Sequence, residues 1–477
     1  MPPLPLTSLL QTALPNLSDT GRSLLSALGC VNGHSPRSGE MAEWLGFHDR
    51  YQLARALRRE GLPPLEVMSG WVRTLYWVLE SETSGSSLRE LAEREHLDPA
   101  IAYRLVRRIT GQRWSEVRRD GLATAVLRFK DRCSTRARTL VMQRSSGTAL
   151  RAVRGHDDPR PITSAPELSG PVSLRPSPTP MSQRVYMSGM PFDVAFTADG
   201  HALVTRPHAA LVDVLALDPL RVVGSIRVGP VPTRIIPSPL GPWAYVTSQF
   251  AESVGIIDLA RGAQVGNIPV PGHPLGAAIS PDGHTLFVVT NQDRLLAIAP
   301  MRRTIVATTA IPLAYHHLAV HPSGRRIFVP CWRTGAVVEF DAHTLEATRR
   351  FQIGGVAHDV VVTGDGQTLY VANEGGWVDA IHLPTERRRT VPLGIPALAL
   401  GLSSDSAPLF VSLFRAGRVV ALRRPGLHEG TVIATGGYPQ RFAVHPNGTV
   451  LVANEAGWVD VVSDGSVQER RAVAVLH

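Results

Sequence analysis

The segment 363–373, with the sequence TGDGQTLYVAN, contains the pattern that decides the fold. A turn pair, Asp365-Gly366, precedes a short run of strand-forming residues, Leu369–Ala372. Asp-Gly favours a two-residue hairpin turn, because both central residues of that turn need positive φ. We therefore predict two antiparallel strands that meet at this turn.

The same pattern recurs along the C-terminal three-fifths of the chain. Equivalent pairs stand 41, 42, 41, 42 and 82 residues apart, at Asp199-Gly200, Leu240-Gly241, Asp282-Gly283, Ser323-Gly324, Asp365-Gly366 and Asn447-Gly448. The last gap is two periods, with a degenerate member near Asp405-Ser406. A third β-rich run, such as Trp377–Ile381, and a fourth, such as Val222–Val228, complete each unit. Four short strands in about 41 residues is the size of one propeller blade. Seven such units predict a seven-bladed β-propeller over residues 183–477.

Three of the units carry a tetrapeptide that resembles the YVTN-type propeller repeat. The tetrapeptide stands at Tyr245–Ser248, Tyr370–Asn373 and Leu451–Asn454. The resemblance implies a closed ring of blades. Unit seven is expected to supply its own fourth strand, Val467–Val475, which leaves Arg184–Met187 as a lead-in segment or an extra edge strand.

Residues 40–133 have a hydrophobic period near 3.6 and few strand formers, which predicts helices. A short helix, Met41–Leu45, is followed by a break and by a helix over Arg50–Arg59. The layout returns as a helix over Ser87–Arg94, a turn, and a helix over Ala100–Ile109 that begins at Asp98-Pro99. An amphipathic helix over Leu65–Leu79 lies between the two. The sequence therefore predicts an α-helical domain built as a twin helix-turn-helix bundle.

These two units resemble the DNA-binding domain of AraC-type transcription regulators. The resemblance is carried by Ala42–Phe47 with Tyr51–Arg55, by Leu88–Ala92 with Tyr103–Arg107, and by Thr110–Arg118. It implies that the second helix of each unit enters the major groove of duplex DNA. In that family the DNA-binding part usually follows the sensor domain, whereas here it comes first.

The residues themselves favour the same partner, because Arg and Gln suit base edges in the major groove. Residues 99–154 hold 14 basic and 3 acidic side chains, a net charge of +11, whereas residues 181–477 hold 24 and 22. Such a basic block favours an anionic partner. The candidate DNA-binding residues are Arg50, Tyr51, Gln52, Arg55, Arg59, Ala100, Tyr103, Arg104, Arg107, Arg108 and Arg113. The alternative is that these are ordinary solvated helix faces with Glu-Arg pairs.

Residues 134–182 are first basic and then rich in Pro and Ser, which predicts an extended, unpacked linker. Residues 1–39 form an N-terminal extension without a secretory signal pattern. The chain has no run of about 18 apolar residues, so no membrane partner is expected. The three cysteines, Cys30, Cys133 and Cys331, are too scattered for a zinc cluster or a disulfide framework, which favours a cytoplasmic location.

Polar residues precede the first strand of most blades, where propellers open into their central channel. This candidate ligand site comprises Asp193, Arg234, His316, His317, His358, Asp359 and Arg441. A ring of this composition suits a small anionic ligand or a protein at the propeller face. A metal at the histidines is a weaker alternative, and neither a metal nor a cofactor is expected. No catalytic constellation is recognised, since there is no Gly-x-Ser-x-Gly elbow or spaced acidic pair.

Three functions remain open from the sequence. The first is a DNA-binding transcription regulator whose propeller senses a ligand or recruits a protein. The second is a propeller interaction scaffold with the helical region as a docking module, and the third is an enzyme with its site at the channel mouth. The fold does not select among them.

Overall fold

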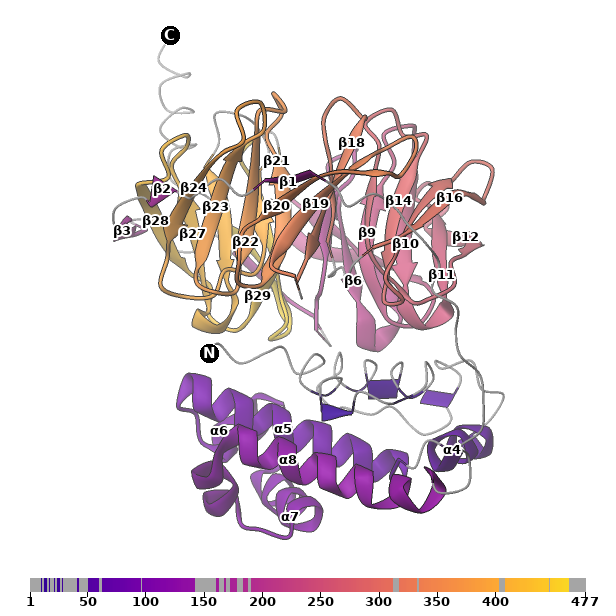
Figure 1. The fold of residues 1–477 in the computed structure, drawn as a ribbon, viewed down its shortest axis with the longest axis vertical. Helices are drawn as coiled ribbons and strands as arrows, with labels where there is room; N and C mark the ends of the chain where they lie inside the picture. Colours follow the sequence, from indigo (N-terminus) through magenta and orange to yellow (C-terminus); the bar gives the residue numbers. More distant parts are fainter. Residues whose placement is uncertain are drawn as a thin grey trace. The chain divides into compact units, whose positions relative to one another are not determined.

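The computed structural model describes scattered positions between residues 10 and 42, and then 50–59, 62–95, 97–141, 160–162, 167–168, 172–177, 183–187, 190–311, 317–332, 334–402, 408–445 and 447–462. The chain divides into two compact units, residues 1–156 and 157–477. The first is helical and the second is the propeller (Figure 1). Each unit is described by itself below.

The helices of the first unit lie in the predicted helical region, residues 40–133, except that the last one continues to Val141 and is interrupted at Gly121 (φ +78°, ψ +171°). They are α4 (Arg50–Arg59), α5 (Leu65–Ser84), α6 (Leu88–Arg94), α7 (Pro99–Thr110) and α8 (Trp114–Val141). The boundaries of α6 and α7 follow from their capping residues. Ser87 and Glu90 form a reciprocal capping box on α6, and the Asp98 side chain accepts a hydrogen bond from Ala100 N at the start of α7. Gly111 ends α7 at φ +77°, a left-handed conformation that glycine adopts without strain.

The core of the helical unit lies on the face of α5 that the sequence predicts. Trp71, Leu75 and Val78 are all buried there, and the Trp71 ring packs 6.0 Å from that of Phe129 in α8. Helices α5 and α7 approach closely at Gly70, where an added Cβ would lie 2.6 Å from the Ile109 side chain. Larger residues at position 70 would therefore separate the two helices.

The structure describes only part of the two helix-turn-helix units that the sequence predicts here. Of the first predicted helix, Met41–Leu45, the structure describes Met41 and Ala42, which are both helical. The second predicted pair is present as α6, a short turn and α7. The helices are thus found where the sequence places them, whereas a twin helix-turn-helix bundle remains a prediction.

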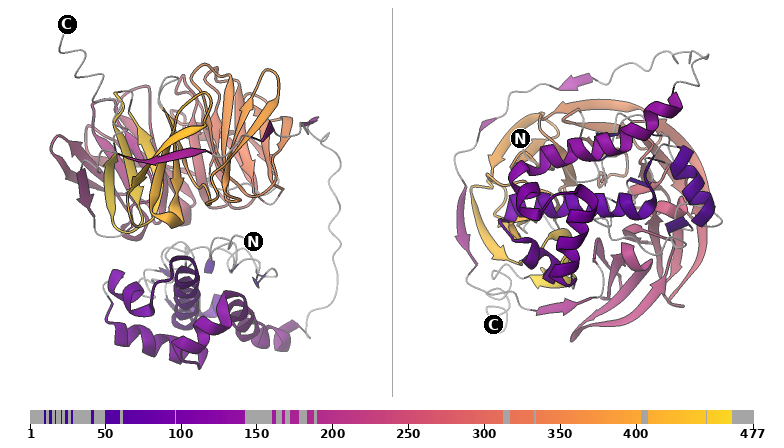
Figure 2. Two further views of the ribbon diagram at one scale, coloured as in Figure 1. Left: turned by 90° about the vertical axis from the view of Figure 1, so that its left-hand side faces the viewer. Right: turned by 90° about the horizontal axis from the view of Figure 1, so that it is seen from below.

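Seven four-stranded antiparallel sheets form the propeller, and they are named blades 1 to 7 in chain order (Figures 1 and 2). Blade 1 comprises β5 (Val194–Phe196), β6 (Ala202–Arg206), β7 (Leu211–Leu217) and β8 (Leu220–Arg227). Blade 2 comprises β9 (Pro232–Pro237), β10 (Trp243–Ser248), β11 (Ser253–Asp258) and β12 (Ala263–Pro269). Blade 3 comprises β13 (Pro274–Ile279), β14 (Leu286–Thr290), β15 (Arg294–Ala299) and β16 (Thr304–Ala310). Blade 4 comprises β17 (Ala319–Val320), β18 (Arg326–Cys331), β19 (Ala336–Asp341) and β20 (Ala347–Gln352). Blade 5 comprises β21 (Ala357–Val362), β22 (Thr368–Asn373), β23 (Trp377–His382) and β24 (Arg387–Pro392). Blade 6 comprises β25 (Leu400–Gly401), β26 (Leu409–Leu413), β27 (Arg418–Leu422) and β28 (Glu429–Ala434). Blade 7 comprises β29 (Pro439–Val444), β30 (Val450–Asn454), β31 (Trp458–Val462) and the N-terminal strand β4 (Gln183–Tyr186).

The turns between the first two strands of blades 1, 3 and 5 differ in type from the prediction. The turns at Gly200, Gly283 and Gly366 have positive φ at the glycine alone, and the preceding aspartates do not. In blade 5 the carboxylate of Asp365 instead accepts hydrogen bonds from the Thr363 hydroxyl and from Gln367 N. The loops are therefore longer than two residues, because the aspartate side chain stabilises the turn that precedes the glycine.

The ring closes differently from the expectation that Val467–Val475 forms the last strand. Residues 463–477 lie outside the described part of the chain, and β4 pairs antiparallel with β31, with Arg184 opposite Asp460. Blade 7 therefore takes its fourth strand from the N-terminal side of the propeller. The predicted lead-in segment is part of the ring itself.

The predicted linker, residues 134–182, is not extended throughout, because helix α8 continues into it as far as Val141. The described parts nearer to β4 are extended, as predicted, but they are not unpacked. Three short strands, β1 (Arg160–Ile162), β2 (Glu167–Leu168) and β3 (Ser173–Pro176), pair in parallel with β20, β24 and β28. Figure 2 shows these magenta strands along the outer rim of the propeller. We call β1–β3 the belt. Its pairing gives blades 4, 5 and 6 a fifth strand each.

Apolar side chains fill the spaces between adjacent blades. One buried cluster joins Phe287 of blade 3 to Ile327 and Phe340 of blade 4. Another joins Leu203 of blade 1 to Val246 of blade 2. Stacking of this kind buries both faces of each sheet, which explains why the units repeat around a ring. Among the described residues, no helix is both long and apolar enough to cross a membrane.

Candidate functional site

The structure describes six of the seven residues predicted at the channel mouth. His316 lies outside the described residues. The other six come from five blades: Asp193 precedes β5, Arg234 lies on β9, His317 precedes β17, His358 and Asp359 lie on β21, and Arg441 lies on β29. Residues that are widely separated in sequence thus meet at one end of the inner strands.

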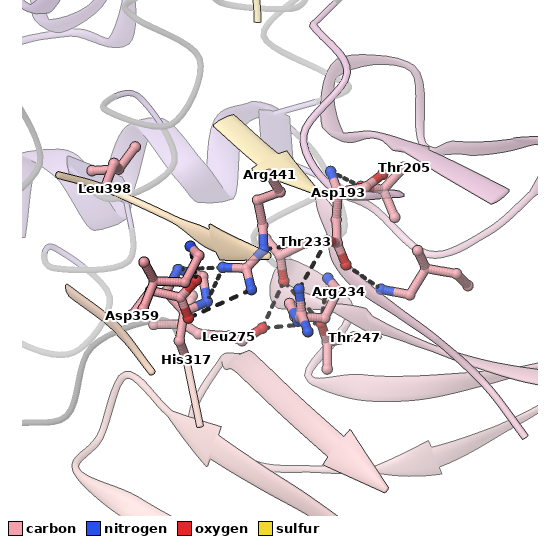
Figure 3. A network of polar contacts seen from close by, with 12 residues as sticks. Asp193, Thr205, Thr233, Arg234, Thr247, Leu275, His317, Asp359, Leu398 and Arg441 are labelled. Carbon is pink, nitrogen blue, oxygen red and sulfur yellow. Dashed lines mark hydrogen bonds and ion pairs between the residues drawn. The ribbon is translucent and has the colours of Figure 1, made fainter. Parts of the chain in front are cut away.

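Arg441 is the centre of this network, as Figure 3 shows. Its Nε lies 3.3 Å from Asp193 Oδ1, and its Nη2 lies 3.8 Å from Asp359 Oδ1. Its Nη1 lies 2.7 Å from Nε2 of His317. Arg441 belongs to blade 7, Asp193 to blade 1, Asp359 to blade 5 and His317 to blade 4. The guanidinium therefore joins blade 7 to its neighbour, blade 1, and also to blades 4 and 5, which are not adjacent to blade 7.

The two aspartates also hold adjacent blades together through the backbone. Oδ2 of Asp193 accepts a 2.9 Å hydrogen bond from the N–H of Ile235 in blade 2. Oδ2 of Asp359 accepts one of the same length from Leu400 N in blade 6. Because the two carboxylates occupy equivalent places in blades 1 and 5, they make equivalent contacts to the next blade. Asp193 additionally accepts a 2.8 Å bond from Arg234.

Burial sets the electrostatics of this cluster. Desolvation of the buried Arg441 side chain lowers the pKa of its guanidinium to about 10, and the nearby charge of Arg234 acts in the same direction. The carboxylates of Asp359 and Asp193 oppose this shift. The arginine stays protonated at neutral pH and is a buried cation between two buried anions.

A second pair of groups lies beside the arginine. The rings of His317 and His358 are 5.2 Å apart, and His358 Nδ1 lies 2.7 Å from the carbonyl oxygen of Leu398. The His358 Nε2 lies 3.8 Å from Oε1 of Glu374, which is buried and has no hydrogen-bond partner at that atom among the described residues. Burial raises the pKa of Glu374 to about 7, and Arg415 partly offsets the shift. This carboxyl group therefore changes charge near neutral pH.

The sequence prediction missed several members of the network. Thr247 Oγ1 lies 2.8 Å from Thr233 Oγ1, and both hydroxyls donate to the carbonyl oxygen of Leu275 in the next blade. The Thr205 hydroxyl accepts a hydrogen bond from Asp193 N. Thr205 and Thr247 are each the last residue but one in the second strand of a blade, so the repeat itself carried the signal. Glu374 carried no comparable signal, since only the fold places it near His358.

The described residues contain no group of three or more His, Cys, Asp or Glu side chains arranged to hold a metal ion. The buried cysteines are not activated either, because burial raises the pKa of Cys133 and Cys331 to about 12. The geometry of the mouth is that of a buried network of ion pairs and hydrogen bonds between blades.

The second candidate site is the surface of the helical unit. All eleven residues predicted to contact DNA are exposed. Helix α4 carries four arginines and α7 carries three, with no acidic residue in either helix. Ile101 and Tyr103 of α7 are 44% and 43% exposed, although both are large and apolar.

Few of these arginines have acidic neighbours. Arg108 lies 3.4 Å from Glu66 of α5, in a pair that is exposed on both sides. Arg50 donates to the Tyr51 hydroxyl and lies over its ring. Within the described part of the unit, Arg55, Arg104 and Arg107 have no ion-pair partner. The face of α7 thus presents uncompensated positive charge beside exposed apolar side chains.

Comparison with known proteins supports the propeller fold. No family model matches the chain, and no curated protein is similar to it at a significant level. Among solved structures, hydrazine synthase of Kuenenia stuttgartiensis is 19% identical with a TM-score of 0.53, over 59% of this chain and 98% of that one. The Cps50 (Swd1) β-propeller domain of Myceliophteria thermophila is 14% identical with a TM-score of 0.53, over 60% and 99%. At these identities the likeness establishes the fold: the C-terminal unit is a seven-bladed β-propeller.

Proposed function

We propose that this chain is a binding protein, in which the propeller is a rigid interaction scaffold and the helical unit is a docking module. The exposed face of α7 is the observation that carries the proposal. Tyr103 and Ile101 lie there beside Arg104 and Arg107, and exposed aromatic residues together with arginine are typical of the centres of binding surfaces.

The channel mouth is consistent with a scaffold. Arg441 contacts both Asp193 and Asp359, and each carboxylate binds the backbone of the next blade, so these polar groups act on the propeller itself. A buried network that joins non-adjacent blades makes the ring stiff. A small anionic ligand at Arg234 and Arg441 would have to compete with Asp193 for both guanidinium groups. The two similar propellers come from hydrazine synthase and from Cps50 (Swd1), so the shared fold does not select between an enzyme and a scaffold.

A DNA-binding regulator is the second candidate, favoured by the unpaired arginines. Helices α4 and α7 carry four and three arginines, and the exposed Gln52 and Tyr51 stand among them. Arginine and glutamine bind base edges, and each phosphate contact releases counterions and makes binding sensitive to salt. On this reading Arg104 and Arg107 would contact the major groove or the phosphates that border it.

One set of variants separates the two candidates in the full chain. Arg104→Ala with Arg107→Ala removes charge, Ile101→Ser with Tyr103→Ala removes apolar surface, and Arg261→Ala with Arg423→Ala is the control on exposed arginines of the propeller. Binding to a labelled duplex DNA library is measured between low and physiological salt, and co-purifying proteins are measured in parallel.

A docking module for protein predicts that the apolar pair of substitutions removes a specific co-purifying protein, while binding to DNA stays weak. A DNA-binding regulator predicts an affinity that falls steeply with salt and about tenfold or more with the arginine pair. If neither pair of substitutions changes either measurement relative to the control, the α7 surface has no binding role and the proposed function fails.

A further inference from the structure

The outer edges of the seven blades are not equivalent. The belt covers the outer strands of blades 4, 5 and 6, and β4 completes blade 7. Among the described residues, no strand pairs with the outer edges of β8, β12 and β16, which belong to blades 1, 2 and 3. Unpaired N–H and C=O groups along such an edge are a template for another extended segment.

Of these three strands, β16 has the least protected edge. Its sequence, TIVATTA, contains no charged residue, glycine or proline. Natural edge strands are usually blunted by such residues. By comparison, β8 contains Arg221 and Arg227, and β12 contains Gly266 and Pro269.

Exposed apolar side chains gather at β16. Ile305 and Val306 are 38% and 58% exposed, and Met301, in the turn just before the strand, is 66% exposed. A β-bulge interrupts the alternation of faces at Val306, because Ile305 pairs with Ile298 and Ala307 pairs with Ala297. An added strand would therefore meet exposed apolar side chains along the first half of β16.

The neighbouring blade shows how such an edge is covered. In blade 4, β1 adds in parallel to β20, with Ile162 opposite Phe351. Ile162 is buried in a cluster with Phe351 and Ile353. Three residues thus suffice to pair with an outer strand and to bury an apolar side chain. The belt covers the outer edges of blades 4, 5 and 6, and β16 is the outer strand of blade 3, which stands next to them in the ring.

The charges around β16 define the complementary partner. Arg302 and Arg303 are exposed just before the strand, and Arg294, also exposed, lies opposite Ala310 at its other end. The guanidinium of Arg303 lies against Gly266 of blade 2. Positive charge at both ends of an uncharged strand favours a peptide with acidic residues at its ends.

We propose that the edge of β16 binds an extended peptide of a partner protein as a parallel fifth strand of blade 3, with apolar side chains at its centre and acidic residues at its ends. Main-chain hydrogen bonds would provide affinity, and the contacts with Ile305, Val306 and the arginines would provide specificity. This inference rests on the proposed scaffold function and names the surface and the chemistry of the partner.

The test measures fluorescence anisotropy of a labelled peptide, Asp-Val-Thr-Ile-Thr-Val-Glu, with the full chain. Ile305→Ser with Val306→Ser is expected to weaken binding at least tenfold. Arg302→Glu with Arg303→Glu is expected to weaken binding of this peptide and to favour a peptide with lysine at both ends. The matched control is Val222→Ser with Val223→Ser, which makes the same change at the exposed valines of β8. Equal binding by the β16 variants and by wild type would overturn the proposal, as would no binding of the peptide at all.

Two other occupants of the edge are distinguished by further measurements. If sedimentation shows a dimer of the wild type that the Ile305 and Val306 substitutions dissociate, the edge is a contact between copies and the proposal is wrong. If hydrogen exchange shows that the amides of β16 are all protected in the isolated chain, another segment of the chain covers the edge, and the proposal is again wrong. The α7 variants report the proposed function separately, so it can survive a failure of the β16 peptide assay.

Discussion

At the scale of single residues, the channel mouth is organised by a buried cation. Arg441 lies between two buried carboxylates, and its position depends on Asp193, Asp359 and His317 together. A buried ion pair of this kind is costly to break, because the remaining charge stays buried without its partner.

Replacement of Arg441 by alanine is expected to destabilise the propeller by about 3 kcal/mol. Asp193 keeps its contact with Arg234, whereas Asp359 loses its only cation among the described residues. Urea denaturation followed by tryptophan fluorescence would measure the change in the free energy of unfolding. Arg423→Ala, which breaks a pair with Glu429 that is exposed on both sides, is the control and should cost less than about 1 kcal/mol. A similar small loss for both variants would contradict the role of Arg441.

Glu374 makes the stability of the propeller depend on pH. Its folded-state pKa is raised from 4.5 to about 7, so between these values the folded state holds a proton that the unfolded state has released. The free energy of unfolding therefore falls by up to about 3 kcal/mol as pH rises from about 4.5 through 7, because Glu374 has to ionise in a buried place. Glu374→Gln keeps the neutral form at every pH. The variant should be more stable than wild type at pH 8 and similar to it at pH 5, as measured by thermal melts at both values. An equal difference at the two pH values would show that Glu374 is not the group responsible.

At the scale of elements, β4 fills a place that a local strand fills in other blades. In blade 5, Asp379 accepts hydrogen bonds from Trp377 Nε1 and from Arg388 Nε, at 3.0 and 2.9 Å. In blade 7, Asp460 accepts the same bonds from Trp458 Nε1 and from Arg184 Nε of β4, at 2.9 and 2.7 Å. In blade 5 this arginine comes from the blade's own fourth strand. In blade 7 it comes from β4, 276 residues before Asp460.

Two matched substitutions test this view of ring closure. Arg184→Ala and Arg388→Ala each leave a buried aspartate without its arginine, and each is expected to cost about 3 kcal/mol. Only the Arg184 variant should also weaken the pairing of β4 with β31, because Arg388 holds a strand that belongs to its own hairpin. Hydrogen exchange at β31 should increase in the Arg184→Ala variant and stay unchanged in Arg388→Ala. Equal exchange in the two would argue against a special role for β4 in closure.

At the scale of the whole molecule, the chain contains two units with separate cores. Differential scanning calorimetry should therefore show two transitions. Ser87→Ala, which removes the N-cap of α6 at a cost of about 1 kcal/mol, should shift one of them. Arg184→Ala should shift the other. A single transition that both substitutions shift equally would mean that the units unfold together.

Much of this architecture is determined locally and can be predicted from the sequence. The recurring turn glycines and β-rich runs predict the number of blades, because each unit forms its hairpins from contacts within about 41 residues. Ser87 and Asp98 likewise predict the starts of α6 and α7, since a cap acts within one helical turn. The candidate residues of the mouth follow from the repeat as well, because equivalent positions of a blade face the same way.

Only the tertiary structure decides the features that join distant segments. The pairing of β4 with β31, the parallel belt and the contact of Arg441 with His317 link residues that are more than 100 positions apart, and no local pattern encodes such partners. The Pro- and Ser-rich composition before β4 predicts an extended chain, but extension alone does not say whether a neighbouring sheet edge accepts it. The sequence by itself determined a ring of seven blades and a basic helical unit. The fold decided how the ring closes, which edges are covered, and that the polar residues of its mouth bind one another, because these outcomes depend on which groups meet in space.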